Sequence, residues 1–228
     1  MIKIEKIVIE GWEASIRGMR NPFNSWDKSD SFRCLEDCIH DKCLNHNRCV
    51  GDFFVGSNDL ALMKRLSKAG SDHSKFLRMI NVTCDITAPL YWWKEYDTYK
   101  VGTVANSCST MHKVHEKEFT VDDFSHEHLS DDSLAFLEDT IYHLNHCRDG
   151  HLIAKREGLS DTAKHYWWQM IQLLPTSYNQ KRTVQLNYQV LKNIYFARRN
   201  HKLTEWHTLC EWIEELPYFK EVCIDGNT

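Results

Sequence analysis

The chain has 228 residues, 42% of them hydrophobic, and a formal net charge of -4 at pH 7. That length and apolar content can fill the core of one large domain or two small ones. A net negative charge gives no general electrostatic reason to bind nucleic acid or an anionic membrane. These properties indicate a folded, soluble protein and exclude nucleic acids and membranes as expected partners.

The first eleven residues, MIKIEKIVIEG, alternate apolar and charged side chains. A secretory signal would show a continuous apolar core instead, and no later run approaches the length of a membrane span. We therefore expect a cytoplasmic protein. The same alternation predicts a strand over 3–10.

An odd number of cysteines, nine, argues against a disulfide scaffold. A cysteine-rich insertion at about 33–50 gathers thiol and imidazole groups, which are the ligands that zinc prefers. A structural zinc site is one interpretation, and a cysteine-rich surface loop is the other. The candidate ligands are Cys34, Cys38, Cys43 and Cys49, with His40 and His46 between them.

Strands and helices mix in the first half of the chain, as judged from apolar spacing, capping residues and turn residues. The expected elements are a polar loop over 17–31, a helix capped by Asn58 or Asp59 and ending at Gly70, a short helix over 73–78, a strand over 79–87, and a helix over 90–100 opened by Pro89.

Residues 119–217 have mostly the apolar spacing of helices, so the fold class is predicted as α+β. Helices are expected after Ser130, over 160–174, over 184–203 and over 204–216. His143, His146, Cys147 and His151 lie on adjacent turns of the first of these, and they indicate either a metal site or a solvated helix face.

The segment TYKVGTVANSCSTMHK, residues 98–113, follows the apolar run Tyr91-Trp92-Trp93 and is rich in hydroxyl and amide groups. We interpret it as a turn that holds a ligand. The alternative is a polar turn that caps the next element through Ser107 or Ser109.

The helix expected over 184–203 places polar groups at both ends of an apolar stripe, which is unusual for pure core packing. That stripe predicts a ligand wall in which Arg198 pairs with an anion or an imide edge. The alternative is a helix at the domain edge, with Arg198 reaching water. The stripe is Asn187, Leu191, Ile194 and Arg198, with Gln189 and Asn193 as a neighbouring pair.

These segments resemble the flavin-dependent thymidylate synthases over about residues 59–215. The family carries a Leu-Pro and then a helix of the form Asn-x-Arg-x-x-x-Asn/His-x-x-x-x-Arg. Here Leu174-Pro175 precedes Asn187, Gln189, Asn193 and Arg198 in that order and spacing. The upstream signature, an Arg-His-Arg followed by an Asn-Glu-x-Ser block, is matched by Lys100, Asn106 and Ser109-Thr110.

Several positions depart from the family pattern, and most of the departures remove positive charge. Ile171 stands where an arginine that grips the nucleotide phosphate is expected. Lys181-Arg182, Arg17, Arg20 and Lys28 are candidate replacements. The other departures are Thr98-Tyr99 in place of Arg-His, Met111-His112 in place of Arg-Tyr, Gln189 in place of an arginine, and Met79 in place of a histidine.

The resemblance implies a single domain over 1–228 with a small antiparallel sheet and a helical C-terminal half, assembled as a homotetramer. It implies methylation of dUMP to dTMP with FAD, reduced nicotinamide (NADPH) and methylenetetrahydrofolate. The protein then supplies orientation and charge, because the cofactor performs the difficult chemistry.

Roles follow from the resemblance position by position. It implies cofactor-binding roles for Lys100, Asn106, Asn187, Gln189 and Asn193. It implies substrate-binding roles for Glu95, Ser109, Thr110 and Arg198, to which Arg182 is added as a candidate phosphate partner; Ser109 and Arg198 are the candidate catalytic residues.

Three alternatives stay open. The enzyme could act on another pyrimidine nucleotide or transfer a hydroxymethyl group. The chain could be a non-catalytic binding module on the same fold. It could also be a zinc-stapled interaction protein whose partner contacts Trp92, Trp93, Trp167 and Trp168.

Overall fold

The structure is a computed structural model that describes residues 2–34 and 53–225. Three of the predicted zinc ligands, Cys38, Cys43 and Cys49, lie outside these residues, as do His40 and His46. Cys34 lies within them and is buried. The zinc site therefore stays a prediction.

The strands are β1 (Lys3–Glu10), β2 (Phe32–Arg33), β3 (Phe53–Phe54), β4 (Asn81–Pro89), β5 (Thr103–Ser107) and β6 (Asn179–Asn187). Four of them form one sheet in the order β1-β4-β6-β5, and β2 pairs with β3 in a separate antiparallel ribbon. The predicted class, α+β with a small antiparallel sheet, is confirmed.

The α-helices are α1 (Trp12–Arg20), α2 (Ser57–Lys68), α3 (Leu90–Tyr96), α4 (Asp131–Arg156), α5 (Ser160–Leu173), α6 (Tyr188–Arg198) and α7 (Thr204–Glu214). Shorter helical turns are η1 (Asn21–Phe23), η2 (Trp26–Lys28), η3 (Ser74–Met79), η4 (Val121–Asp123) and η5 (Lys220–Ile224). No helix in the described ranges is long and apolar enough to cross a lipid bilayer.

Contacts divide the chain into two compact units, which are described one at a time. The first comprises Met1–Ile7, Cys84–Lys100 and Val104–Val184, and the second comprises Val8–Thr83, Val101–Thr103 and Gln185–Thr228. The division is one of contacts within the chain. Whether residues 1–228 fold as a single domain, as predicted, stays a prediction.

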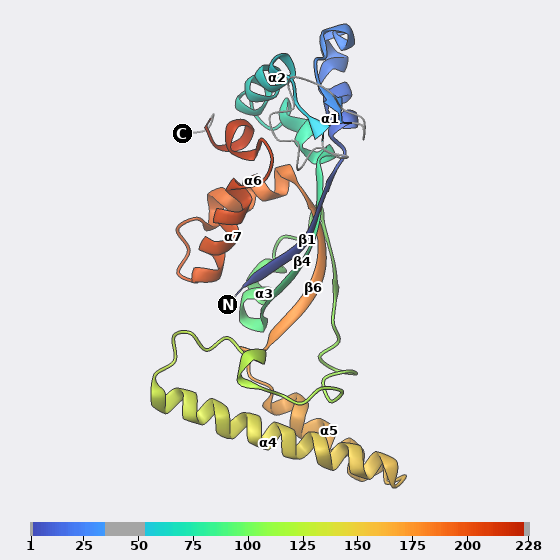
Figure 1. The fold of residues 1–228 in the computed structure, drawn as a ribbon, viewed down its shortest axis with the longest axis vertical. Coiled ribbons are helices and arrows are strands. Elements are labelled where there is room, and N and C mark those ends of the chain that lie inside the picture. Colours follow the sequence, from blue (N-terminus) through green and yellow to red (C-terminus); the bar gives the residue numbers. More distant parts are fainter. Residues whose placement is uncertain (1, 35–52, 226–228) are drawn as a thin grey trace. The chain divides into compact units, whose positions relative to one another are not determined.

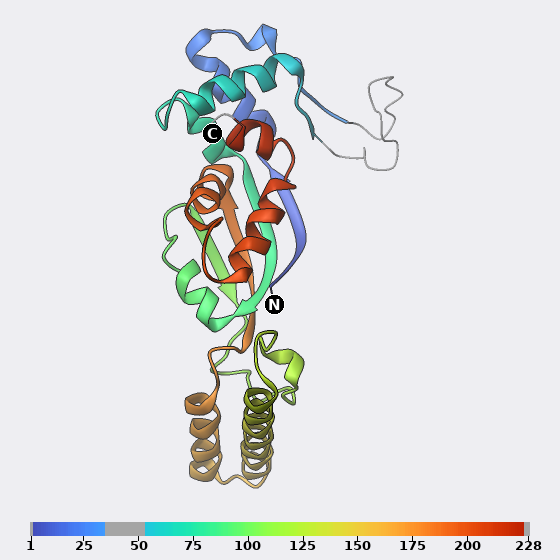
Figure 2. The ribbon, with the colours of Figure 1, turned by 90° about the vertical axis from the view of Figure 1, so that its left-hand side faces the viewer.

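In the first unit, α4 and α5 lie side by side as an antiparallel pair (Figures 1 and 2). Ser130 begins α4 as predicted, because its Oγ accepts the Ser133 backbone N–H. A Cβ atom at Gly150 would lie 2.7 Å from the Tyr166 ring, so glycine allows α5 to approach closely. The apolar cluster between these elements is Val114, Phe119, Phe124, Leu137, Ile141, Leu144, Cys147 and Met170.

The helix α3 contributes the aromatic part of the first unit's core. Trp92 and Trp93 are 0% and 1% exposed, and the Trp93 indole N–H donates to the Gln180 carbonyl at 2.9 Å. Burial of the Tyr96 side chain beside them raises its pKa. These two tryptophans therefore fill a core and do not present a partner surface.

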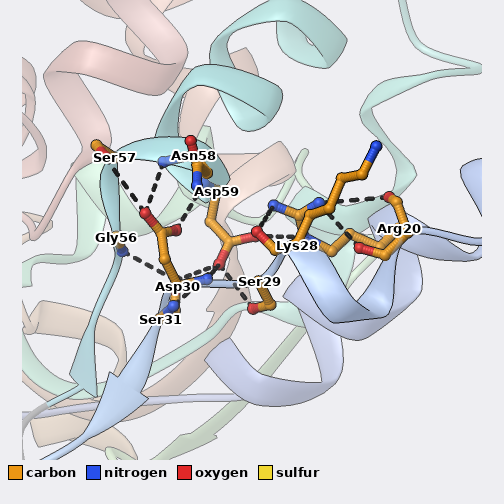
Figure 3. A network of polar contacts seen from close by, with 10 residues as sticks. Arg20, Lys28, Ser29, Asp30, Ser31, Gly56, Ser57, Asn58 and Asp59 are labelled. Atoms are coloured by element: carbon orange, nitrogen blue, oxygen red, sulfur yellow. Dashed lines mark hydrogen bonds and ion pairs between the residues drawn. The ribbon is translucent and has the colours of Figure 1, made fainter.

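In the second unit, a buried ion pair joins α1 to α2. Arg20 Nε lies 2.6 Å from Asp59 Oδ1, and the two side chains are 5% and 0% exposed. The other guanidinium nitrogens donate to the carbonyl groups of Ser25 and Lys28. Ser29 and Ser31 hydroxyls donate to Asp59 Oδ2 at 2.8 and 2.6 Å (Figure 3).

The same network caps α2 with a residue from outside the helix. Asp30 accepts the backbone N–H groups of Asn58 and Asp59 at 2.9 and 3.1 Å (Figure 3). A Cβ atom at Gly56 would lie 2.2 Å from the Asp30 side chain, so glycine makes room for this contact. The prediction that Asn58 or Asp59 caps the helix is therefore wrong, because a carboxylate distant in sequence satisfies its first N–H groups.

The prediction of a loop over 17–31 is wrong for its first residues, because residues 17–20 belong to the helix α1. Trp12, Ile16 and Met19 fall at helical spacing and are buried. The remainder of the predicted loop is ordered, as expected, through η1 and η2.

Strand boundaries correct two more predictions. The strand predicted over 79–87 is confirmed as β4, but the polar segment after residue 100 contains β5. The helix predicted over 184–203 begins only at Tyr188, because the alternating buried residues Gln180, Val184 and Leu186 belong to β6.

Replacing Asp59 with asparagine should lower the free energy of unfolding by about 3 kcal/mol at pH 7, because it leaves the Arg20 charge buried without its partner. Burial raises the pKa of Asp59, but hydrogen bonds from Ser31, Ser29 and Arg20 outweigh it and hold the pKa below the ordinary 3.8. This contribution is present above pH 3.8 and is lost as the pH falls through the lowered pKa.

Urea unfolding of the wild type, Asp59→Asn and Asp27→Asn at pH 7 and pH 3 tests this prediction. Asp27 lies in the same loop and is exposed, so its variant should match the wild type. Equal stability of Asp59→Asn and the wild type at pH 7 would contradict a stabilising role for the pair.

Candidate functional site

The predicted ligand-binding residues are distributed over both units, and each group is described within its own unit. The first unit contains Glu95, Lys100, Asn106, Ser109, Thr110 and Arg182, and the second contains Asn187, Gln189, Asn193 and Arg198.

Arg182, on β6, is held by three groups of the first unit. Its guanidinium carbon lies 4.2 Å from the centre of the Trp93 ring, its Nη1 donates to Asp97 at 2.8 Å, and its Nε donates to Gln180 at 2.9 Å. The side chain is 15% exposed. Two donors and one face of the guanidinium are therefore engaged inside the protein. Arg182 thus acts as a structural brace that joins β6 to α3.

Ser109 organises the segment that follows β5. Its Oγ accepts the backbone N–H groups of Met111 and His112 at 3.3 and 2.9 Å. The Met111 carbonyl in turn accepts the Trp167 indole N–H at 2.8 Å. Ser109 thus performs the turn-capping role that we considered as the alternative, and its hydroxyl proton is not used in either of these bonds.

The remaining predicted residues of the first unit lie on its surface or close to it. Lys100 and Asn106 are exposed, whereas Glu95 and Thr110 are half-buried. The segment is tied to β6 because Gln180 Nε2 donates to the Cys108 carbonyl at 2.7 Å. These four side chains are accessible to a ligand from solvent.

Lys181, named as a candidate phosphate partner, is paired with an acid. Its Nζ lies 3.1 Å from Asp85 Oδ2, and this contact raises the pKa of Lys181. Asp85 also accepts the Thr183 hydroxyl at 2.7 Å. A free ammonium group for a phosphate is therefore not provided at this position.

In the second unit, Asn187 begins α6. Its Oδ1 accepts the Val190 backbone N–H at 3.1 Å, so the amide is an N-cap. A Cβ atom at Gly102 (φ +77°) would come within 3.2 Å of Asn187 Nδ2 and 3.1 Å of Val190. Glycine therefore allows Gly102 and its neighbours in the second unit to approach the first turn of α6 closely.

Gln189 and Asn193 form the predicted pair one helical turn apart. Gln189 Nε2 donates to Asn193 Oδ1 at 3.1 Å, and Gln189 Oε1 accepts the Ser74 hydroxyl at 3.2 Å. Asn193 is exposed and Gln189 is half-buried. The pair is thus held in a fixed orientation with one amide facing solvent.

Arg198, at the end of α6, lies over an aromatic ring. Its guanidinium carbon is 4.8 Å from the centre of the Trp206 ring, which is fully buried in α7. This stacking holds the plane of the guanidinium against the ring. Leu191 and Ile194 are buried, so the predicted stripe combines an apolar centre with polar ends.

Three residues that support the site were not predicted: Ser74, Asp97 and Gln180. Each has at least one partner distant in sequence, which for Gln180 is the Cys108 carbonyl, so a sequence pattern carries no direct signal for them. Only Gln180 has an indirect sequence signal, because the alternation of buried and exposed residues along β6 places its amide on the buried face.

No group of three or more histidine, cysteine or acidic side chains in the described part of the chain is arranged to hold a metal ion. Within the cluster on α4, Cys147 and His151 are buried, whereas His143 and His146 are exposed. His151 Nδ1 contacts the Ala163 carbonyl at 2.8 Å. The solvated-face interpretation is therefore wrong for Cys147 and His151, which pack towards α5.

No protein-family model matches the chain, and no curated protein matches it in sequence. Two solved structures of the flavin-dependent thymidylate synthase ThyX from Helicobacter pylori, both with FAD and dUMP, match it in structure. One is 15% identical, covers 99% of both chains and has a TM-score of 0.61. The other is 16% identical, covers 98% of this chain and 99% of its own, and has a TM-score of 0.62. The predicted resemblance is confirmed at the level of the fold: the chain has the fold of the flavin-dependent thymidylate synthases.

Proposed function

We propose that the protein is a flavin-dependent enzyme that methylates dUMP to dTMP, with FAD, NADPH and methylenetetrahydrofolate as co-reactants and a homotetramer as the working assembly. The observation that supports this most is the polar row on α6, Asn187, Gln189, Asn193 and Arg198, in a chain whose fold matches ThyX over nearly its whole length.

The side chains on α6 fit a flavin. The edge of an isoalloxazine ring presents alternating carbonyl and N–H groups, and an amide can donate to one and accept from the other. Asn193 offers such an amide to solvent, and its hydrogen bond from Gln189 fixes which way it faces. In this proposal Lys100 serves as a point charge for a cofactor phosphate, and Asn106 supports the same ligand.

FAD, when bound, supplies the redox chemistry, because it accepts a hydride from NADPH and returns it to the one-carbon unit taken from methylenetetrahydrofolate. Arg198 would stabilise negative charge that develops on the imide edge of the uracil. The Trp206 ring holds the guanidinium plane, so little side-chain freedom remains to be lost at that moment.

Ser109 would position the nucleotide in this proposal. Because its oxygen already accepts two backbone N–H groups, the hydroxyl is polarised as a donor. It can donate its proton to a nucleotide oxygen without moving from the turn. Thr110 and Glu95, both half-buried, complete the polar groups that we assign to the nucleotide.

A different nucleotide or one-carbon product is the second candidate. Ile171 packs against the apolar cluster of the first unit at the position where the resemblance expects a phosphate-binding arginine. Met111 is exposed where another arginine is expected. Without these two guanidinium groups, the nucleotide phosphate would have to be bound by other residues. Analysis of the reaction product distinguishes transfer of a methyl group from transfer of a hydroxymethyl group.

We expect the purified protein to retain FAD after reconstitution and gel filtration, and Asn193→Ala to weaken FAD binding about tenfold through loss of one hydrogen-bonding amide. Flavin absorbance and fluorescence titration measure both effects. Asn200→Ala, which removes an exposed amide beyond the end of α6, is the matched control and should bind like the wild type. A chain that stays colourless after reconstitution would rule out the flavoenzyme and favour a non-catalytic binding module.

Arg198→Lys should lower the rate of product formation about 100-fold while FAD stays bound, because lysine keeps the charge and loses the planar donor edge. Single-turnover conversion of labelled dUMP, with products separated by chromatography, measures this rate. Arg199→Lys changes the neighbouring exposed arginine and should have the wild-type rate. An unchanged rate in Arg198→Lys would remove this residue from the catalytic machinery.

A further inference from the structure

We propose that the first unit carries a binding site for a phosphate-class anion at the turn between α4 and α5. The site is a cavity of about 420 Å³. Its polar lining residues come from three segments: His112 and His115 precede α4, His151 and Lys155 lie near its end, and Ser160 and Lys164 lie at the start of α5. This inference goes beyond the proposed function, because it requires neither flavin nor turnover.

The charge of the cavity is its first argument. Two ammonium groups and three imidazoles line it, and none of the described residues that line it is acidic. The nearby acid Glu116 is paired with Lys113 and is not a lining residue, although its charge also acts on His115 and Lys155. An unbalanced positive lining of this kind attracts an anion and repels a metal cation.

Buried imidazole nitrogens without a protein partner are the second argument. The Ala163 carbonyl can only accept, so His151 Nδ1 carries the proton that it donates at 2.8 Å. His151 is 9% exposed, and its Nε2 has no hydrogen-bond partner among the described residues. His115 Nδ1 is also buried and has no hydrogen-bond partner among the described residues. The centres of the His115 and His151 rings are 4.6 Å apart. Leaving such atoms unsatisfied costs about 1–3 kcal/mol each.

An anion in the cavity would satisfy this arrangement. Burial, and the proximity of His151 and Lys155, lower the pKa of His115. A negative charge among these groups favours the protonated form of His115, whose second N–H then has an acceptor. The O–H of a hydrogen phosphate can donate to His151 Nε2. The same charge offsets the repulsion between Lys155 and the His115 imidazole when the latter is protonated.

The backbone of α5 adds a third contribution. This helix of 14 residues begins at Ser160, the residue before it provides no side-chain cap, and Ser160 itself lines the cavity. The first N–H groups of a helix carry partial positive charge and suit a tetrahedral oxyanion. The acid of this first turn, Asp161, does not line the cavity. A phosphate, with four oxygens, can accept from helix, lysine and imidazole donors at once.

Titration of the full-length protein with inorganic phosphate, followed through the histidine and Trp167 indole NMR signals, tests the proposal. We expect saturable shifts that sodium chloride at equal ionic strength does not reproduce. Lys155→Ala and Lys164→Ala should each weaken phosphate binding about tenfold. Arg156→Ala removes a positive charge from the adjacent exposed position and should change the affinity less than twofold.

A parallel titration with dUMP distinguishes the sources of the phosphate. Tighter binding of dUMP with the same shifted signals assigns the site to a nucleotide phosphate, whereas equal or weaker binding assigns it to free phosphate. Shifts that sodium chloride reproduces, or equal losses in Lys155→Ala and Arg156→Ala, would overturn the site. Because no flavin takes part, this outcome is independent of the FAD and turnover experiments.

Discussion

The buried pair of Arg20 and Asp59 is the constraint on which the second unit depends. Both charges are removed from water, so every donor and acceptor must be satisfied inside the protein, and the loop between α1 and β2 folds around them. The loop then delivers Asp30 to the start of α2. The end of α2 is joined to α6, because Lys192 Nζ donates to the Ser67 hydroxyl at 2.9 Å. A chain of polar contacts thus connects the buried ion pair, through α2, to α6.

Both units hold an arginine against a tryptophan face. Arg182 stacks on Trp93 at 4.2 Å and Arg198 on Trp206 at 4.8 Å, and both indoles are buried. A planar cation on a fixed ring loses most of its rotational freedom before any ligand arrives. Arg182 gives two edge donors to Gln180 and Asp97, which suits a brace. Arg198 stands at the end of the polar row on α6, and this position is why we place it, and not Arg182, opposite a reacting ring.

Local patterns were sufficient to predict much of the fold. Alternation identified β1 and β4, and Ser130 marked the start of α4. The boundary between β6 and α6 was missed because apolar residues continue across it, and only Asn187, as an N-cap, marks the change of period. In the candidate site, α6 was predicted from its polar spacing. Ser74 was not, because its contact with Gln189 spans 115 residues and depends on packing that no local pattern encodes.

Ile171 stands where the family resemblance implies a phosphate-binding arginine, and its surroundings are apolar. Its side chain packs against the cluster that contains Met170 and Leu144, both fully buried. An arginine there would have to carry its charge out of apolar surroundings or find a buried partner, and either requirement is costly. Isoleucine instead adds to the core that joins α4 to α5. This position is apolar and Arg182 is engaged as a brace, whereas Lys155 and Lys164 line the cavity at the turn between α4 and α5. The helix pair thus combines an apolar interior at Ile171 with two cations at its turn.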